Sequence, residues 1–267
     1  MILNRLGNKT RIAKDIICHF PQHRTFIDMF FGAGGIFFNK PLARHNFCND
    51  IDDDIFNLYM VLQSDKDELV RQIEMMPISE NLFRHWRSNR EIEPIKKSVR
   101  FLMLSNFGLM GSSGLMHFVK SDMKISILSK IESTFLFIQN VQFMCVDFRD
   151  CISKIAFRND GRNEQGECFI YADPPYLETT NNYSQGFNEQ DTINLFDVLI
   201  NSKIRFALSE FDHPSVLELA KHHNLEVITI GERKNIKNRR TEILVVNYES
   251  PALYSLFRNQ EHSFSLV

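Results

Sequence analysis

Short apolar runs alternate with amphipathic helical periods along most of the 267-residue chain. Apolar runs bounded by turn-forming residues are typical of buried strands, whereas apolar residues spaced three or four apart indicate helices. The pattern predicts strands at residues 25–30, 45–50, 141–146, 169–172, 205–209, 226–230 and 241–248. Helices are expected at residues 9–19, 55–62, 189–200 and 214–223, and another is expected to open at residues 36–38. Strands that alternate with helices predict an α/β fold with a mostly parallel, doubly wound sheet.

Two parts of the chain depart from this rhythm. The last two predicted strands are joined by a basic loop without a helix, so we expect an antiparallel C-terminal strand. Residues 64–140 carry helical periods among many charges, which predicts an inserted, mainly helical module. The predicted organisation is therefore an α/β domain built from residues 1–63 and 141–267, with residues 64–140 as the insert. Residues 159–167 read as a polar loop.

Composition narrows the class of protein. Apolar residues make up 43% of the chain and charged residues 24%, as in ordinary soluble globular proteins. The five cysteines are scattered without a Cys-x-x-Cys pair, which argues against a zinc ribbon or a disulfide framework. We see no signal-peptide pattern at the first residues and no apolar run of the roughly 20 residues that a membrane helix needs. We therefore expect a cytoplasmic protein with no metal and no membrane partner.

Positive charge is concentrated in two places, although the net charge is only −2. Residues 81–130 contain nine cations and three acids, and residues 233–240 contain five cations and no acid. A solvated surface explains scattered lysines, but it explains two sign-biased clusters less well. The distribution favours a nucleic-acid partner over a plain surface.

The strand at residues 169–172 ends abruptly in Asp173-Pro174-Pro175-Tyr176. The two prolines offer no N–H to a strand ladder, and Pro174 restricts Asp173 to extended geometry. This makes a stiff turn that carries a carboxylate, free carbonyls and an aromatic ring where α/β sheets bind ligands. A flat group with N–H donors, such as the amine of a nucleobase, would suit it. An ordinary tight turn remains the alternative, because these residue types also favour turns.

Three further strand ends carry candidate ligand groups. The first is the segment Asp28-Met29-Phe30-Phe31-Gly32-Ala33-Gly34-Gly35, whose small residues let backbone approach a ligand before the expected helix. Its spacing fits neither a dinucleotide fingerprint nor a P-loop. Asp50 follows the next strand, where an acid can accept ribose hydroxyls. Asp147 and Phe148 follow the strand at 141–146 and could meet an adenine, although Asp147 could instead cap the segment that follows it.

Taken together, these motifs resemble the S-adenosylmethionine-dependent DNA adenine-N6 methyltransferases, in the group ordered as glycine motif, target-recognition insert and Asp-Pro-Pro-Tyr. Nearly the whole chain takes part, including a Gly-x-Lys at Gly7-Asn8-Lys9 and the late strand Arg240-Thr241-Glu242-Ile243. Many members carry an aromatic residue just before the Gly-x-Lys, where this chain has Arg5-Leu6. The resemblance implies a Rossmann-like methyltransferase sheet, with residues 64–140 as the target-recognition domain.

The resemblance also implies the roles of individual residues. The catalytic set would be Asp173, Pro174, Pro175 and Tyr176, with Asp173 and the Pro174 carbonyl accepting the target amine and Tyr176 stacking on a flipped-out base. S-adenosylmethionine would be bound by Lys9, Asp28, Phe30, Gly32, Gly34, Asp50, Asp147, Phe148 and Asp173. Contacts to double-stranded DNA would come from Arg84, Arg87, Lys120, Lys124, Arg239 and Arg240.

The motifs leave several alternatives open. A cytosine-N4 or an RNA adenine methyltransferase needs similar acceptors for an exocyclic amine. A nucleic-acid-binding protein could keep the cofactor fold without turnover, although the intact Asp173-Pro174-Pro175-Tyr176 turn counts against this. Whether a cognate restriction endonuclease acts beside the chain, which sequence it recognises and how many copies assemble are not encoded in these motifs.

Overall fold

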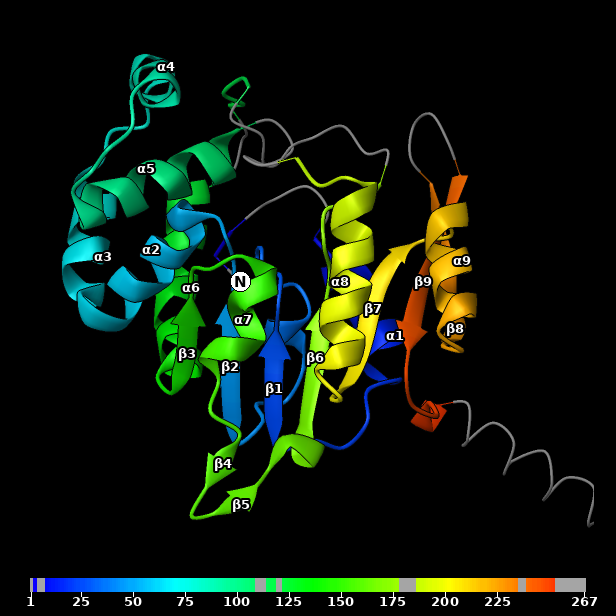
Figure 1. Ribbon diagram of the computed structural model, residues 1–267. Helices are drawn as coiled ribbons and strands as arrows, with labels where there is room; N and C mark the ends of the chain where they lie inside the picture. Colours follow the sequence, from blue (N-terminus) through cyan, green and yellow to red (C-terminus); the bar gives the residue numbers. More distant parts are fainter. Residues whose placement is uncertain are drawn as a thin grey trace, which may run out of the picture.

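The fold is built on a seven-stranded sheet with strand order β3-β2-β1-β6-β7-β9-β8 (Figure 1). The computed structural model describes residues 2–3, 8–108, 114–118, 122–177, 186–234 and 239–252. The sheet strands are β1 (Thr25–Asp28), β2 (His45–Asn49), β3 (Val141–Met144), β6 (Cys168–Ala172), β7 (Arg205–Phe211), β8 (Glu226–Lys234) and β9 (Arg239–Val246). Each predicted strand is thus confirmed, with its ends displaced by a few residues.

The strand directions also follow the prediction. β1 pairs in parallel with β2 and β6, and β2–β3 and β6–β7 are parallel as well. β9 runs antiparallel to both of its neighbours, β7 and β8. This is the expected mostly parallel sheet with an antiparallel C-terminal strand. The carboxyl ends of β1, β2, β3 and β6 therefore lie at one edge, the upper edge in Figure 1.

Alternate residues along the central strands feed two hydrophobic cores, one on each face of the sheet. On β1, Phe26 belongs to one core and Ile27 to the other. Phe169 and Ile170 divide in the same way on β6. Both faces are buried, which explains why these strands read as continuous apolar runs.

Helices cover both faces. They are α1 (Ala13–Ile17), α2 (Asp53–Ser64), α3 (Lys66–Met75), α4 (Glu80–Ser88), α5 (Pro94–Phe107), α6 (Met123–Ile138), α7 (Phe148–Cys151), α8 (Glu189–Asn201) and α9 (Pro214–His222). In Figure 1, α7, α8 and α9 lie on the near face and α1 lies behind the sheet. The doubly wound arrangement is therefore present.

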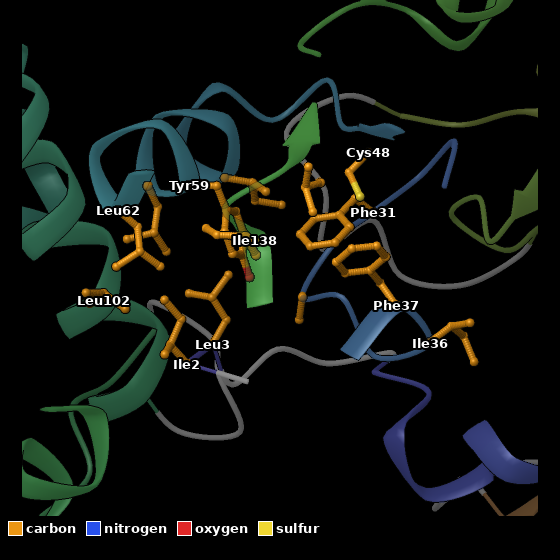
Figure 2. Packing of buried hydrophobic residues seen from close by; sticks show 14 of the residues in the cluster. Ile2, Leu3, Phe31, Ile36, Phe37, Cys48, Tyr59, Leu62, Leu102 and Ile138 are labelled. Atoms are coloured by element: carbon orange, nitrogen blue, oxygen red, sulfur yellow. The ribbon is translucent and has the colours of Figure 1, made fainter. Parts of the chain in front are cut away.

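Residues 64–140 are mainly helical, as predicted, but most of their helices share the main core. Leu102 of α5 and Ile138 of α6 pack in the same cluster as Tyr59 and Leu62 of α2 (Figure 2). The Gln63 side chain also donates to the carbonyl oxygens of Ile138 and Val141, at 2.7 and 3.0 Å. α4 projects furthest from the sheet (Figure 1). The boundaries of a separate domain at 64 and 140 stay a prediction.

The prediction that a helix opens at residues 36–38 is wrong. The segment after the glycine loop makes a single 3-10 turn, Phe37–Asn39, and then becomes extended at Lys40. Pro41 explains the stop, because a proline disfavours helical geometry in the residue before it and has no N–H to donate. A helix N-terminus therefore cannot supply positive potential to the glycine loop.

The polar loop at 159–167 also contains more order than expected. It holds a short hairpin, β4 (Arg158–Asn159) and β5 (Arg162–Asn163), followed by a 3-10 turn at Gln165–Glu167. The hairpin lies at the edge of the sheet opposite the strand carboxyl ends (Figure 1). Across the described ranges, no helix is long and apolar enough to span a membrane.

Candidate active site

A cleft opens at the carboxyl ends of β1, β2, β3 and β6. Its walls come from five segments that the sequence singled out, and from the start of α8 with the residues just before it. The lining residues include Asn8, Lys9, Asp28, Phe30, Gly32, Asp50, Asp147, Phe148, Arg149, Asp173, Pro175, Phe187 and Asp191. The topology thus brings together side chains from distant parts of the chain, at the edge where parallel sheets bind ligands.

Asn49 holds these strand ends in place. Its buried side-chain amide donates to the carbonyl oxygens of Met29 and Val146, at 3.2 and 3.0 Å. The side-chain oxygen of Asn49, Oδ1, accepts the backbone N–H of Val146 at 3.1 Å. One side chain therefore connects the segments that follow β1, β2 and β3, and it fixes the spacing of the groups that line the cleft.

The glycine loop is tied to Asp50. The Asp50 carboxylate accepts the backbone N–H of Gly32 at 2.6 Å and that of Asp52 at 2.9 Å. Gly32 has a positive φ of 55°, and the space where its Cβ would lie is open apart from the Phe30 carbonyl oxygen at 4.0 Å. Gly34 is different, because its missing Cβ faces aromatic side chains and it does not line the cleft. At Gly32 the backbone of the loop is therefore exposed to the cleft, whereas at Gly34 the loop packs against aromatic side chains.

Asp28 places a carboxyl at the bottom of the cleft. It is only 2% exposed, and its Oδ1 has no hydrogen-bond partner among the residues described. Burial raises the pKa of Asp28 well above its usual range, and the nearby carboxyls of Asp173 and Asp50 raise it further. An unpartnered buried carboxyl oxygen in a cleft is a strong acceptor for a ligand N–H or a cation.

Asp147 takes part in two arrangements at once. Its carboxylate caps α7 by accepting the Arg149 N–H at 2.9 Å, which confirms the capping alternative raised from the sequence. It also forms an ion pair with the Arg149 guanidinium at 2.9 Å, and Arg149 pairs with Asp191 of α8 as well. Asp147 nevertheless lines the cleft, so capping and ligand contact are compatible.

Aromatic rings form the wall beside Asp147. The centroids of Phe30 and Phe148 lie 5.6 Å apart, and Phe187 lies 6.1 Å from Phe30 and 5.9 Å from Phe148. Arg149 covers the Phe148 ring, with its guanidinium carbon 4.4 Å from the ring centroid. A flat heterocycle would find apolar faces here next to a carboxylate acceptor.

The Asp173-Pro174-Pro175-Tyr176 turn follows β6 directly. Asp173 and Pro175 line the cleft, whereas Pro174 is buried. Lys9 donates to Asp173 Oδ1 at 2.8 Å. Burial raises the pKa of Asp173, and the charge of Lys9 opposes this shift. The pairing of Lys9 with Asp173 joins two residues that lie far apart in the sequence.

Tyr176 lies beside this pair and does not line the cleft. Lys9 Nζ is 4.2 Å from its ring centroid, and the Phe211 ring is 4.6 Å away in an edge-on arrangement. The Tyr176 hydroxyl donates to Glu242 of β9. Stacking of a base on Tyr176 therefore stays a prediction, and the ring is engaged with protein groups in this structure.

The structure describes the side chains of four candidate DNA-contacting residues: Arg84, Arg87, Lys124 and Arg240. Arg84 and Arg87 are exposed on α4, and Arg240 donates to the Leu177 carbonyl oxygen at 3.1 Å beside the Asp173 turn. Lys124 donates to the carbonyl oxygens of Glu74 in α3 and of Met76, the residue that follows α3, the latter at 2.9 Å. Lys120 and the Arg239 side chain lie outside the described residues.

Several residues of the site had not been predicted. Arg149, Phe187 and Asp191 line the cleft, and Glu242 contacts the groups around Asp173. A glutamate inside the apolar strand at 241–248 was the available signal for Glu242, because buried acids need partners. Arg149 and Asp191 carried no comparable signal, since charged residues near helix ends are common.

The chain is similar to known proteins over most of its length. Residues 6–236 match the family model of the D12 class N6 adenine-specific DNA methyltransferases. The DNA adenine methylase of Vibrio cholerae is 24% identical over 90% of this chain and 93% of its own length. That of Escherichia coli K12 is 23% identical over 84% and 85% of the two chains. The modification methylase StsI of Streptococcus sanguinis is 25% identical over 93% of this chain and 43% of its own. Because the family model spans most of the chain, this protein belongs to the D12 class of N6 adenine-specific DNA methyltransferases.

Proposed function

We propose that the cleft binds S-adenosylmethionine as the methyl donor for adenine-N6 methylation. The unpartnered Oδ1 of Asp28 suits a cationic group of such a ligand, and the open backbone at Gly32 allows close approach. Asp50 lies one strand further along, where a carboxylate can accept ribose hydroxyls. Phe30 and Phe148 would contact the adenine ring, and Asp147 would accept its amine. Lys9 and Gly34 contribute indirectly, by holding Asp173 and by shaping the loop.

The reaction needs a methyl acceptor that is normally unreactive, because the adenine amine is conjugated with its ring. We propose that Asp173 and the Pro174 carbonyl accept the two N–H groups of this amine and align its lone pair. When bound, the cofactor supplies a methyl group on a positively charged sulfur. Transfer of this methyl group would form the N6–carbon bond and leave the sulfur as a neutral thioether, and the proton lost from the amine would pass to solvent by way of Asp173, which accepts that N–H. Asp173 and Pro174 contribute orientation and electrostatic stabilisation.

The target adenine must leave the duplex to reach Asp173. We propose that Pro175 and Tyr176 border the flipped base, while Arg84, Arg87, Lys120, Lys124, Arg239 and Arg240 neutralise phosphates around it. Of these residues, Arg240 is the one described beside the turn, through its bond to Leu177. Relatives that are named as modification methylases support the presence of a cognate restriction endonuclease as a partner.

The single observation that carries this proposal is the Asp173 carboxylate, held by Lys9 at 2.8 Å in the wall of the cleft. We would incubate the protein with labelled S-adenosylmethionine and unmethylated duplex DNA, and then identify the modified nucleoside. We expect the label in N6-methyladenine. Replacing Asp173→Ala should lower the transfer rate by at least about 10²-fold, as for other preorganised polar groups at a reacting atom.

The control is cofactor binding by calorimetry, because a folded Asp173→Ala protein should still use the adenine and ribose contacts of the cleft. Near-normal methyl transfer by this variant would remove Asp173 from the catalytic role. Label in another nucleoside would contradict the proposed target amine.

A further inference from the structure

Two buried carboxyls lie behind the Asp173 turn, and the reaction described above uses neither of them. Glu210 of β7 and Glu242 of β9 are each only 1% exposed. The two strands are neighbours, and Glu210 lies opposite Ile243 in their antiparallel pairing. Burying a carboxyl is costly unless it is protonated or paired with donors. The partners of each carboxyl therefore indicate what it does.

Glu242 contacts the groups that surround Asp173. Its Oε1 accepts the hydroxyl of Tyr176 and that of Ser209, the latter at 2.8 Å. The same oxygen lies 3.5 Å from Lys9 Nζ, while Lys9 donates to Asp173 at 2.8 Å. Glu242 thus holds both Lys9 and Tyr176, and it does not itself line the cleft.

The positive charge of Lys9 links Glu242 to Asp173. Lys9 is 3% exposed, so its ammonium depends on the carboxylates beside it rather than on water. With Glu242 present, one cation is shared between two carboxylates. Asp173 then keeps acceptor capacity for the N–H groups of a target amine. Without the Glu242 charge, Lys9 would pair with Asp173 alone and compete with the amine for it.

We propose that Glu242 is a positioning residue for methyl transfer, which acts through Lys9 and Tyr176 to hold Asp173 ready for the target amine. This inference rests on the proposed role of Asp173. The family model match ends at residue 236, before β9 begins, so the assignment comes from the contacts of this chain.

Glu210 provides a matched control on the neighbouring strand. Its Oε1 accepts the Phe211 N–H at 2.8 Å, and its Oε2 has no partner within the described part of the chain. Burial raises the pKa of Glu210 to about 9, so this carboxyl is neutral near pH 7. A glutamine at 210 replaces a neutral acid with a neutral amide, whereas a glutamine at 242 removes a charge beside Lys9.

The experiment compares Glu242→Gln with Glu210→Gln in the full chain. For each variant we would measure single-turnover methylation of unmethylated duplex DNA, cofactor affinity by calorimetry and thermal unfolding. We expect Glu242→Gln to slow methyl transfer by about 10- to 100-fold, the range for a small displacement of a reacting group. Its cofactor affinity should equal that of the wild type. Glu210→Gln should keep the wild-type rate.

A second comparison tests the route through Tyr176. Tyr176→Phe removes a hydroxyl that hydrogen-bonds with both Glu242 and Asp173. Because the three groups share one network, the effect of Tyr176→Phe on the rate should not add fully to that of Glu242→Gln. Fully additive effects would overturn this part of the inference. If Glu242→Gln does not fold, two other variants replace it. Glu242→Asp keeps the charge, and we expect it to fold. Tyr176→Phe should slow methyl transfer, and a wild-type rate for this variant would overturn the proposal.

The outcomes separate the two proposals. A wild-type rate for Glu242→Gln, with Asp173→Ala inactive, would overturn the role of Glu242 and leave the proposed function intact. Near-normal transfer by Asp173→Ala would instead remove the proposed function on which the inference rests. If Glu242→Gln lowered the methylation rate, the cofactor affinity and the thermal stability together, Glu242 would have a structural role only, which also contradicts the proposal.

Discussion

Glu210 shows how one residue can couple the stability of this fold to pH. An unfolded glutamate ionises above about pH 4.3, whereas burial holds the pKa of Glu210 at about 9 in the folded protein. Between these values the folded state binds a proton that the unfolded state has lost. The contribution of Glu210 to the free energy of unfolding therefore falls as pH rises through this window.

Glu210→Gln removes this proton linkage. We expect the variant to gain stability over the wild type as pH rises, by up to about 1.4 kcal/mol per pH unit within the window. Urea unfolding at about pH 6 and about pH 8 would measure the difference. Parallel pH profiles for the two proteins would show that Glu210 is ionised in the folded state.

At the same scale, the sequence predicted the residues of the turn but not their support. Asp173 and Lys9 were both expected at the site, and the structure brings their charged groups to 2.8 Å. Glu242 received no role from the sequence. Its partners depend on β9 lying beside β7, a non-local pairing that the residues around Glu242 do not encode.

At the scale of elements, the glycine loop has little room for an added methyl group at Gly34. Gly34 has a φ of 72°, and a Cβ there would meet Phe38 ring carbons at 2.5 and 2.6 Å and Phe31 Cζ at 2.8 Å. Gly161, in the β4–β5 hairpin, has a similar φ of 78° but nothing within 4 Å of the added atom. The two positions separate backbone strain from steric clash.

We therefore expect Gly34→Ala to destabilise the protein more than Gly161→Ala. Both variants carry the cost of left-handed backbone, about 1–2 kcal/mol, and Gly34→Ala adds about 1–3 kcal/mol for overpacking. Chemical denaturation of the two variants would measure the difference. Equal losses would mean that the rings of Phe31 and Phe38 move aside at no cost.

The same loop shows where local patterns mislead. Strands were predicted well because both faces of the sheet are buried, which produces continuous apolar runs. The expected helix after Gly35 failed because Pro41 acts from beyond the pattern of residues 36–38 and ends the turn at Lys40. The apolar pattern predicted that residues 36–38 are helical, but the length of this helical segment depends on Pro41, which lies outside the pattern.

At the scale of the whole molecule, the order of motifs along the chain predicted which strand ends meet. Parallel strands put their carboxyl ends at one edge, so Asp28, Asp50, Asp147 and Asp173 were expected together, and all four line one cleft. The separation between catalytic part and insert was harder to predict. α5 and α6 bury apolar residues in the main core, and only packing across the molecule reveals this.

The placement of α4 supports a prediction about DNA binding. In Figure 1, α4 stands beyond the edge of the sheet where β1, β2 and β3 end, whereas the β4–β5 hairpin lies at the opposite edge. Arg84 and Arg87 are exposed on α4, and the ion pair of Arg84 with Glu80 is a surface pair of little strength. The Arg87 guanidinium donates to the Gly114 carbonyl oxygen and keeps further N–H groups. Both exposed cations can therefore still meet phosphates on the side of the molecule where the cleft opens.

Replacing Arg84 and Arg87 by glutamine should weaken DNA binding and reduce its dependence on salt. Each lost phosphate contact lowers the slope of log K against log[salt] by about 0.9, so the double variant should lose about 1.8. The matched control replaces Arg158 and Arg162 of the hairpin, which should leave the slope unchanged. Because phosphate contacts carry no sequence information, the loss should be equal for specific and non-specific duplexes. Equal slopes for the α4 variant and the wild type would place the DNA on another face of the molecule.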